Sequence, residues 1–383
     1  MAVARMLALA AVAGAHCEVR YNRTSNALKY NLTTLTAGVA EAVAAVTGAN
    51  SDGEPGKAFW PFALRHFMTP VAGYYICDHY VGGELEGYEM PPPDGSPLEA
   101  TAASLASVKP LASVYVTAKR VTEFAEAILP LLRVPVILLT GGNELPQVEK
   151  SNWTESLRTD PRIVHWFSQN PLYPASSRYS GLTYGLHHHS ILAYARALLK
   201  QARGGAPAKT RGLSIGYVSK HRMNGWMRAG LPAGPKLDHD AYYDLLAGAE
   251  HVLSPCGDRC DTYRNAEAIG LGAVPATNAP EHLYRPGLYE DSALFFDARR
   301  PQFANSARKD PRKHLPRYAE PDRGLVHADY WRHRIRAVRC YAAWRLADHR
   351  LEPPPRDPTA EERAERREPY KAELGWLQFA QHR

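Results

Sequence analysis

Arg264 and Glu267 are the two residues whose types and spacing best suit the binding of a phosphorylated ligand. They lie three positions apart in a segment, 262–271, whose pattern predicts a helix, so both side chains share one helical face. A guanidinium near a helix N-terminus suits a diphosphate, and a carboxylate one turn further along accepts hydrogen bonds from ribose hydroxyls. The alternative is an intrahelical ion pair, which adds little stability if it is exposed.

The residues before this helix predict a strand followed by a loop. The apolar run 251–253 is short enough for a strand, and the loop after it carries Ser254, Gly257 and Asp258. A glycine there permits close approach of the backbone to a phosphate, although a Gly-Asp pair is also typical of an ordinary turn. We therefore count these three residues as candidate donor-binding residues.

A basic cluster follows another predicted strand, 213–218. Lys220 and Arg222 come shortly after this strand, and Arg228 lies six residues beyond Arg222. Cations at a strand end neutralise the charge that develops on a leaving diphosphate, a task that a metal ion performs in other transferases. A basic surface turn is the alternative.

Together these residues resemble the C-terminal signature of exostosin-like glycosyltransferases. The similar pattern, within residues 212–297, is Ser254-Pro-x-Gly257, Asp261-x-x-Arg264-x-x-Glu267-Ala268 and Gly272-x-Val274-Pro275. A weaker similarity covers 162–170 and 181–186. The resemblance implies a two-domain enzyme of the GT-B type that transfers a sugar from a nucleotide-sugar donor with inversion. It also implies that Glu267 binds the ribose of the donor.

Residues suited to sugar recognition lie near the end of a strand that is predicted to begin at residue 162. His165, Trp166, Gln169 and Asn170 combine a ring that can stack on a sugar with polar groups that can bind its hydroxyls. We expect them on the acceptor side of a cleft. The alternative is a Trp–Phe core pair with Asn170 in a turn.

Glu144 is the candidate general base. It follows the apolar run 135–140, which predicts the clearest strand of the first half of the chain. A carboxylate at the end of such a strand could accept the proton of an acceptor hydroxyl. It could equally be a solvated loop carboxylate.

We expect neither a metal nor a cofactor. The three histidines 187–189 would point in different directions on a helix, and the Asp-x-Asp pattern 238–240 follows no apolar strand. Cys256 and Cys260 are spaced for a small-loop disulfide or two buried thiols rather than for zinc.

The first residues predict entry into the secretory pathway, to the Golgi lumen or the cell exterior. Residues 1–17 combine a charged start, an apolar run and small residues before Cys17, which is typical of a signal peptide or a short anchor. The glycosylation sequons at Asn22, Asn31 and Asn152 agree with this expectation. Membrane association is expected only through this N-terminal segment.

Strand and helix patterns alternate along the chain, and the strands are nearly continuous apolar runs. This pattern indicates parallel sheets covered on both faces. We predict an α/β fold with two doubly wound, Rossmann-like domains in a GT-B-like arrangement. The domains are 18–185 on the acceptor side and 186–328 for the nucleotide sugar, followed by a helical tail, 329–383.

Charge and composition exclude one class of partner. The net charge of the 383 residues is +7, but residues 299–383 hold 20 Lys and Arg against 12 Asp and Glu, and the other residues hold 26 against 27. The main body is thus near neutral and lacks the basic face typical of a nucleic-acid-binding domain.

The sequence therefore predicts a metal-independent glycosyltransferase whose donor is a nucleotide sugar and whose acceptor is a hydroxyl of a glycan or glycoprotein. Two alternatives share the same fold class. One is a nucleotide-sugar epimerase, and the other is a non-catalytic, sugar-binding relative.

Overall fold

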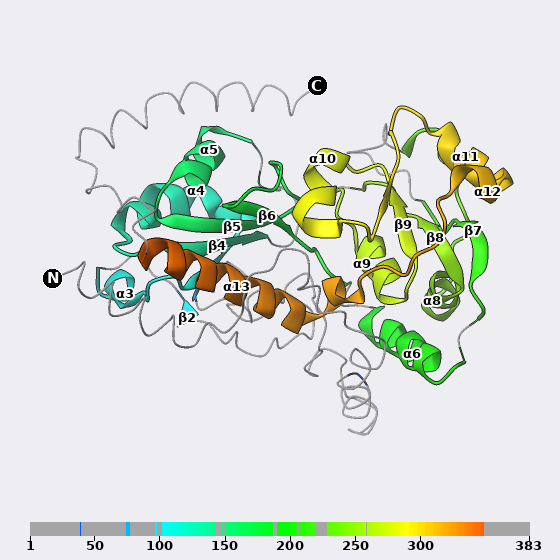
Figure 1. Cartoon of the computed structure of the whole chain (residues 1–383), viewed down its shortest axis with the longest axis horizontal. Coiled ribbons are helices and arrows are strands. Elements are labelled where there is room, and N and C mark those ends of the chain that lie inside the picture. Colours follow the sequence, from blue (N-terminus) through cyan, green and yellow to red (C-terminus); the bar gives the residue numbers. More distant parts are fainter. Residues whose placement is uncertain are drawn as a thin grey trace.

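The computed structural model describes residues 39, 74–76, 96–97, 102–141, 148, 150–186, 190–205, 207–218, 228–257 and 259–347. Within these residues the chain is an α/β structure with two parallel sheets, each surrounded by helices (Figure 1). This architecture is compatible with two Rossmann-like domains. The first sheet lies within residues 74–182 and the second within 210–295, so the predicted boundary near 185 falls between them.

The first sheet has six strands in the order β2-β1-β3-β4-β5-β6. These strands are β1 (Tyr74–Ile76), β2 (Ser96–Pro97), β3 (Ser113–Thr117), β4 (Val136–Gly141), β5 (Ile163–Gln169) and β6 (Tyr179–Leu182). All neighbours are parallel, so each connection must cross over the sheet. Helices α3 (Ala102–Ser107) and α5 (Asn152–Thr159) and the helical segment 118–131 provide three of these crossovers.

The helical segment 118–131 is irregular after its first turn. It includes a short α4 (Val121–Glu123), one π-helical turn (Phe124–Ile128) and one 3-10 turn (Leu129–Leu131). Pro130 has no backbone N–H, so the regular hydrogen-bond ladder cannot continue through this turn. Phe124, Ile128 and Leu129 are nevertheless buried, and the segment keeps its packing role.

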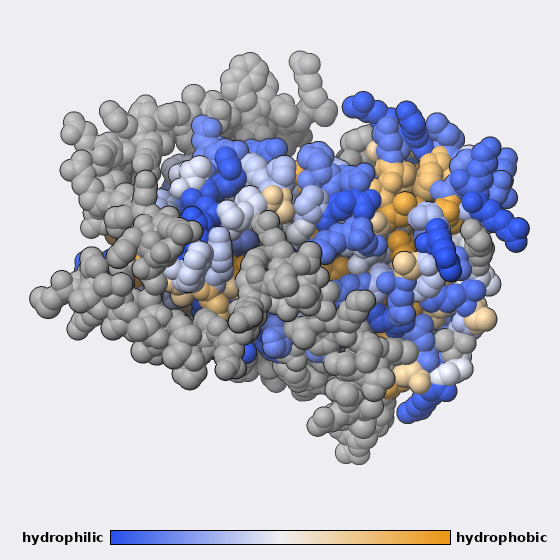
Figure 2. Space-filling view, viewed as in Figure 1, coloured by the Kyte–Doolittle hydropathy of each residue, from blue (hydrophilic) through white to orange (hydrophobic). Residues whose placement is uncertain are grey.

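The second sheet has four parallel strands in the order β10-β9-β8-β7. These are β7 (Thr210–Ser214), β8 (Ala249–Leu253), β9 (Val274–Thr277) and β10 (Leu294–Phe295). The helices around them are α6 (Ile191–Ala202), α8 (His239–Ala247), α9 (Tyr263–Gly270), α10 (Glu281–Tyr284), α11 (Gln302–Lys309) and α12 (Pro311–His314). Figure 2 shows apolar residues gathered over this half below α11, between hydrophilic groups.

Both faces of the first sheet are covered, because successive side chains of a strand point to opposite faces. Tyr115 and Leu139 belong to one hydrophobic core, whereas Val114 and Leu138 belong to another that includes residues of the 118–131 segment and α5. This double burial explains why the strands read as continuous apolar runs.

The last described helix, α13 (Ala328–Ala347), returns from the second half of the chain to the first (Figure 1). Its residues Trp331 and Ile335 lie in the same core as Tyr115, and Arg339 Nε donates a hydrogen bond to the Leu111 carbonyl at 3.0 Å. The described part of the expected helical tail therefore packs on the first sheet. Residues 348–383 of the predicted tail lie outside the described residues.

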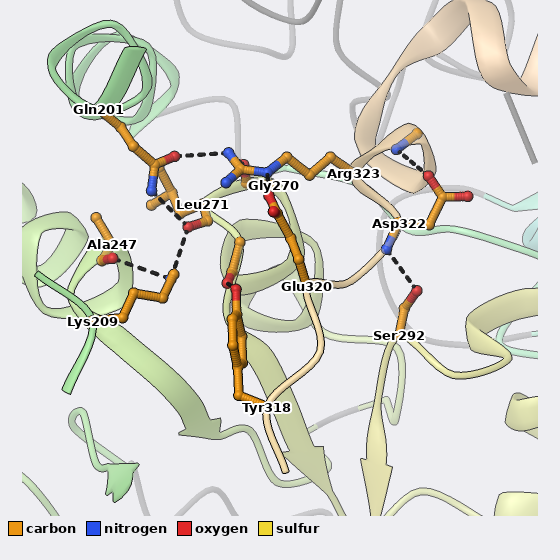
Figure 3. A network of polar contacts seen from close by, with 12 residues as sticks. Gln201, Lys209, Ala247, Gly270, Leu271, Ser292, Tyr318, Glu320, Asp322 and Arg323 are labelled. Atoms are coloured by element: carbon orange, nitrogen blue, oxygen red, sulfur yellow. Dashed lines mark hydrogen bonds and ion pairs between the residues drawn. The ribbon is translucent and has the colours of Figure 1, made fainter. Parts of the chain in front are cut away.

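A network of polar contacts lies at the amino ends of the strands of the second sheet (Figure 3). Lys209 Nζ donates to the carbonyls of Ala247 at 3.1 Å and Leu271 at 3.3 Å, which are at or near the C-terminal ends of α8 and α9. Arg323 Nη1 donates to the Gly270 carbonyl at 3.0 Å. These cations satisfy carbonyls that the helices leave unpaired at their ends. Burial lowers the pKa of Lys209 to about 8.

Candidate functional site

A pocket of about 380 Å³ opens beyond the carboxyl ends of β7 and β8. Its described lining residues are Ser190, Tyr217, Val218, Arg228, His239, Tyr242, Tyr243, Pro255, Thr262, Tyr263, Arg264 and Glu267. Ligands of open parallel sheets bind at this end of the strands. All of these residues lie between 190 and 267, within the predicted nucleotide-sugar domain.

The loop between β8 and α9 is fixed by a disulfide between Cys256 and Cys260. The Cys256 carbonyl accepts a hydrogen bond from Arg228 Nε at 2.8 Å. A Cβ atom at Gly257 would lie 2.6 Å from Arg228 Nη2, so any other residue there would require this guanidinium to shift. Gly257 thus serves the close approach of an arginine that lines the pocket. The neighbouring Asp258 lies outside the described residues.

Arg264 lies on the first turn of α9 and its guanidinium reaches the segment after β7. Nη2 donates to the Tyr217 carbonyl at 2.6 Å, and Nη1 to the Leu253 carbonyl at 3.4 Å. Nε donates to the Tyr242 hydroxyl at 3.3 Å. These acceptors hold the guanidinium in the wall of the pocket.

Glu267 is a buried carboxylate, 5% exposed, in the same wall. Its Oε2 accepts a hydrogen bond from the Tyr242 hydroxyl at 2.8 Å, and its Oε1 lies 3.1 Å from the Tyr243 hydroxyl. Burial raises the pKa of Glu267, while the two tyrosine hydroxyls and the charge of Arg264 oppose this rise. Each carboxylate oxygen has two acceptor positions, so one position on each remains for a ligand.

Tyr242 connects the two residues singled out from the sequence. Its hydroxyl accepts from Arg264 and donates to Glu267. This bridged arrangement differs from the direct intrahelical ion pair considered above. The tyrosine could not be found from spacing, because it lies on another helix, 25 residues before Glu267.

The other candidate donor-binding residues differ in their position relative to the pocket. Arg228 lines the pocket, whereas Ser254 is fully buried outside it and donates to Asn265 Oδ1 at 2.5 Å. Ser254 therefore stabilises the loop and is not part of the pocket lining. Lys220 and Arg222 lie outside the described residues.

The residues expected on the acceptor side of a cleft do not reach this pocket. His165 and Trp166 are buried in the middle of β5, between strands β4 and β6. Trp166 is 1% exposed, packs in the core and donates to Thr140 Oγ1 at 2.8 Å. His165 Nε2 lies 2.9 Å from Ser180 Oγ, and burial lowers the pKa of His165 to about 4. For Trp166 the structure therefore shows the packing alternative.

Gln169 and Asn170 lie where β5 meets the second half of the chain. Gln169 Nε2 donates to the Thr183 carbonyl at 3.0 Å. Asn170 Oδ1 accepts from the backbone N–H of Asp261 at 3.1 Å. Both side chains are buried and serve as internal connections, not as pocket lining.

Asp261, which the sequence pattern includes without a role, is a fully buried carboxylate. It accepts hydrogen bonds from the Tyr184 backbone N–H and from the Tyr289 hydroxyl. Burial raises the pKa of Asp261 to about 7. Its position directly after Cys260 places it between the pocket loop and the first half of the chain.

The remaining expectations concern the three sequon asparagines, Glu144 and the N-terminal segment. Asn152 is exposed at the start of α5, and Thr154 of its sequon is buried and forms a capping box with Ser151. Asn22, Asn31 and Glu144 lie outside the described residues, as does the segment 1–17.

Metal ligation finds no support among the described side chains, where no three His, Cys, Asp or Glu residues are grouped. Asp238 instead caps α8, because its Oδ1 accepts from the Ala241 N–H at 2.8 Å. Over the same residues, no helix is both long and apolar enough to cross a membrane.

Compared with known proteins, the chain matches no protein-family model, and no curated protein sequence matches it.

Proposed function

We propose that the protein is a glycosyltransferase that transfers a sugar from a nucleotide-sugar donor to a hydroxyl of a glycan or glycoprotein. One observation carries this proposal: Arg228, Arg264 and Glu267 line a single pocket beyond the carboxyl ends of a parallel sheet. Two cations and a carboxylate in one cavity match the diphosphate and the ribose of such a donor.

In this proposal the diphosphate lies between Arg228 and Arg264, near the N-terminal end of α9. Thr262, the residue before α9, lines the pocket and makes no side-chain capping bond, so the first backbone N–H groups of this helix add to the favourable field. The ribose hydroxyls donate to the free acceptor positions of Glu267. Because Tyr242 and Tyr243 fix the carboxylate, it does not have to reorganise when the ribose binds.

The reaction that fits these groups is a substitution at the anomeric carbon of the donor sugar. The acceptor oxygen forms the new bond, the bond from the anomeric carbon to the phosphate oxygen breaks, and the nucleoside diphosphate leaves with the electron pair. The two guanidiniums stabilise the negative charge of the leaving group, which is the task of a metal in other enzymes. Inversion, a GT-B-like arrangement and Glu144 as the base for the acceptor proton belong to the proposal.

The Cys256–Cys260 disulfide supports the proposed location in the secretory pathway, because disulfides persist in oxidising compartments. An acceptor that is a glycan or glycoprotein is found in the same compartments. The near-neutral main body agrees with a partner other than nucleic acid.

A thermal-shift screen against UDP, GDP and their sugar conjugates tests the proposal. A ligand at a hundredfold excess over its Kd stabilises the folded protein by about 2.7 kcal/mol. Arg264→Ala and Glu267→Gln should each weaken binding by roughly tenfold or more, because each removes a charged hydrogen-bond partner. Arg300→Ala is the matched control, since Arg300 is exposed and pairs only weakly with Asp297 at 3.9 Å.

The proposal is wrong if no nucleotide or nucleotide sugar raises Tm, or if both pocket variants bind as the wild type does. Release of nucleoside diphosphate in the presence of a glycan acceptor then separates a transferase from a protein that only binds. An epimerised donor sugar without release would indicate an epimerase.

A further inference from the structure

The pocket has two chemically different ends. Arg228 and Pro255 lie at one end, beside the start of α9. Glu267 lies one helical turn further along α9, with Tyr243 and Ser190 beyond it. The two ends therefore favour one direction for a ligand that has an anionic end and a polar middle.

His239 belongs to the end that holds Glu267. It lines the pocket, and its ring centroid lies 6.5 Å from that of Tyr243, whose hydroxyl contacts Glu267. Tyr243 therefore lies between His239 and the carboxylate of Glu267. His239 is exposed at the first residue of α8, so a ligand can reach its ring.

The two aspartates beside His239 are occupied by structural roles. Asp238 caps α8, and Asp240 pairs with Arg196 of α6 at 3.4 Å. Neither aspartate lines the pocket. Of the three residues 238–240, only His239 lines the pocket.

We propose that His239 contacts the nucleobase of the bound nucleotide. This inference rests on the proposed function. A nucleoside diphosphate is a linear arrangement of diphosphate, ribose and base. With the diphosphate at Arg228 and Arg264 and the ribose at Glu267, the base extends past Glu267 toward His239.

An imidazole ring suits this position for two reasons. Its face can stack on any base, and base–aromatic stacking contributes about 1–3 kcal/mol. The ring also offers hydrogen-bonding nitrogen atoms to the base edge.

The opposite orientation makes a different prediction, and a different aromatic residue would carry it. Tyr217 is 48% exposed and lines the pocket beside Arg264, which binds its carbonyl. If the nucleotide lay in the reverse direction, its base would lie near Arg228 and Arg264 and would stack on Tyr217 instead of His239. The two residues therefore report on the direction in which the nucleotide lies.

The test uses the full-length protein and titration calorimetry with three probes: UDP, GDP and base-free ribose 5-diphosphate. His239→Ala should weaken binding of UDP or GDP about tenfold, as expected for loss of one stacking contact, and leave ribose 5-diphosphate unchanged. Arg264→Ala should weaken all three. Asp240→Asn, on the same helical turn but outside the pocket, is the control and should bind as the wild type does.

Failure of this inference is distinguishable from failure of the proposed function. If Arg264→Ala weakens binding but His239→Ala does not, the pocket binds nucleotides and the role of His239 is wrong. If the loss falls on Tyr217→Ala, the nucleotide lies in the reverse direction, which also overturns the inference. Equal loss of all three probes in His239→Ala would indicate a general electrostatic effect and overturn it as well. If none of the probes binds the wild type, both proposals fail.

Discussion

The side-chain oxygen of Asn170 accepts a hydrogen bond from the backbone N–H of Asp261, at 3.1 Å. Asn170 directly follows β5, and Asp261 lies between β8 and α9, so this contact joins the carboxyl ends of the two sheets. Asp261 also accepts a hydrogen bond from the Tyr184 backbone N–H, which follows β6. The loop that borders the pocket is therefore anchored to the first half of the chain.

Substitution of Asn170 should separate two effects. Its φ is 54°, a left-handed conformation that asparagine tolerates better than most residues. Asn170→Ala loses the hydrogen bonds that Oδ1 accepts from the Asp261 N–H and, at 3.3 Å, from the Tyr284 hydroxyl, and it adds backbone strain. We therefore expect a loss of roughly 2–4 kcal/mol of unfolding free energy. Asn170→Gly loses the same hydrogen bonds without the strain and should cost less. Urea unfolding of both variants measures this, and equal losses would contradict the role of the backbone conformation.

Tyr242→Phe should weaken nucleotide binding without removing either charged group of the pocket. The change deletes the hydroxyl that donates to Glu267 and accepts from Arg264, so both side chains lose their fixed position. We expect a roughly fivefold loss of UDP affinity, close to the value of one hydrogen bond. Tyr341→Phe on α13 is a control outside the pocket lining. Unchanged affinity in Tyr242→Phe would show that the bridge does not position the site.

Burial of His165 should make the folded protein less stable in acid. Its folded-state pKa is lowered from 6.5 to about 4 by burial, so its contribution is fully present above pH 6.5 and is lost as pH falls toward 4. Over this window the loss is at most ~3 kcal/mol. His165→Gln has no such titration. The difference in unfolding free energy between wild type and variant should therefore shrink as pH falls from 7 to 5, and a constant difference would contradict the buried neutral imidazole.

Asp261 should give the stability of the protein a pH dependence of the opposite sign. Its folded-state pKa is raised from 3.8 to about 7, so the stability linked to the protonated form is present below pH 3.8 and is lost as pH rises through 7. Asp261→Asn stays neutral and can still accept from the Tyr184 N–H. Relative to wild type, the variant should gain stability between pH 5 and 8 in thermal unfolding. A relative loss over that range would show that Asp261 is ionised in the folded protein.

The apolar strands were predictable because they are buried on both faces. Val136 to Leu139 and the run 251–253 are too short for typical helices and are followed by glycine-containing loops, so β4 and β8 lie close to where the sequence places them. The pairing of Arg264 with Glu267 in one pocket wall was also accessible, because helical spacing alone puts them on one face.

The residues that complete the site could not be predicted from sequence spacing. Tyr242 and Tyr243 reach Glu267 from another helix, and nothing in their spacing specifies that contact. Trp166 has the composition of a sugar-stacking residue, but whether a strand position faces a core or a cleft depends on the elements packed above it. Sequence patterns describe one element at a time and contain little information on such neighbours.

The return of α13 to the first sheet has a consequence for synthesis of the protein. Tyr115 and Leu139 lie in the core to which α13 contributes Trp331 and Ile335, more than two hundred residues later in translation order than Tyr115. While the ribosome is still translating the second sheet, that apolar surface has no permanent cover. Packing of this core is therefore complete only after α13 has been synthesised, so the N-terminal half finishes folding late.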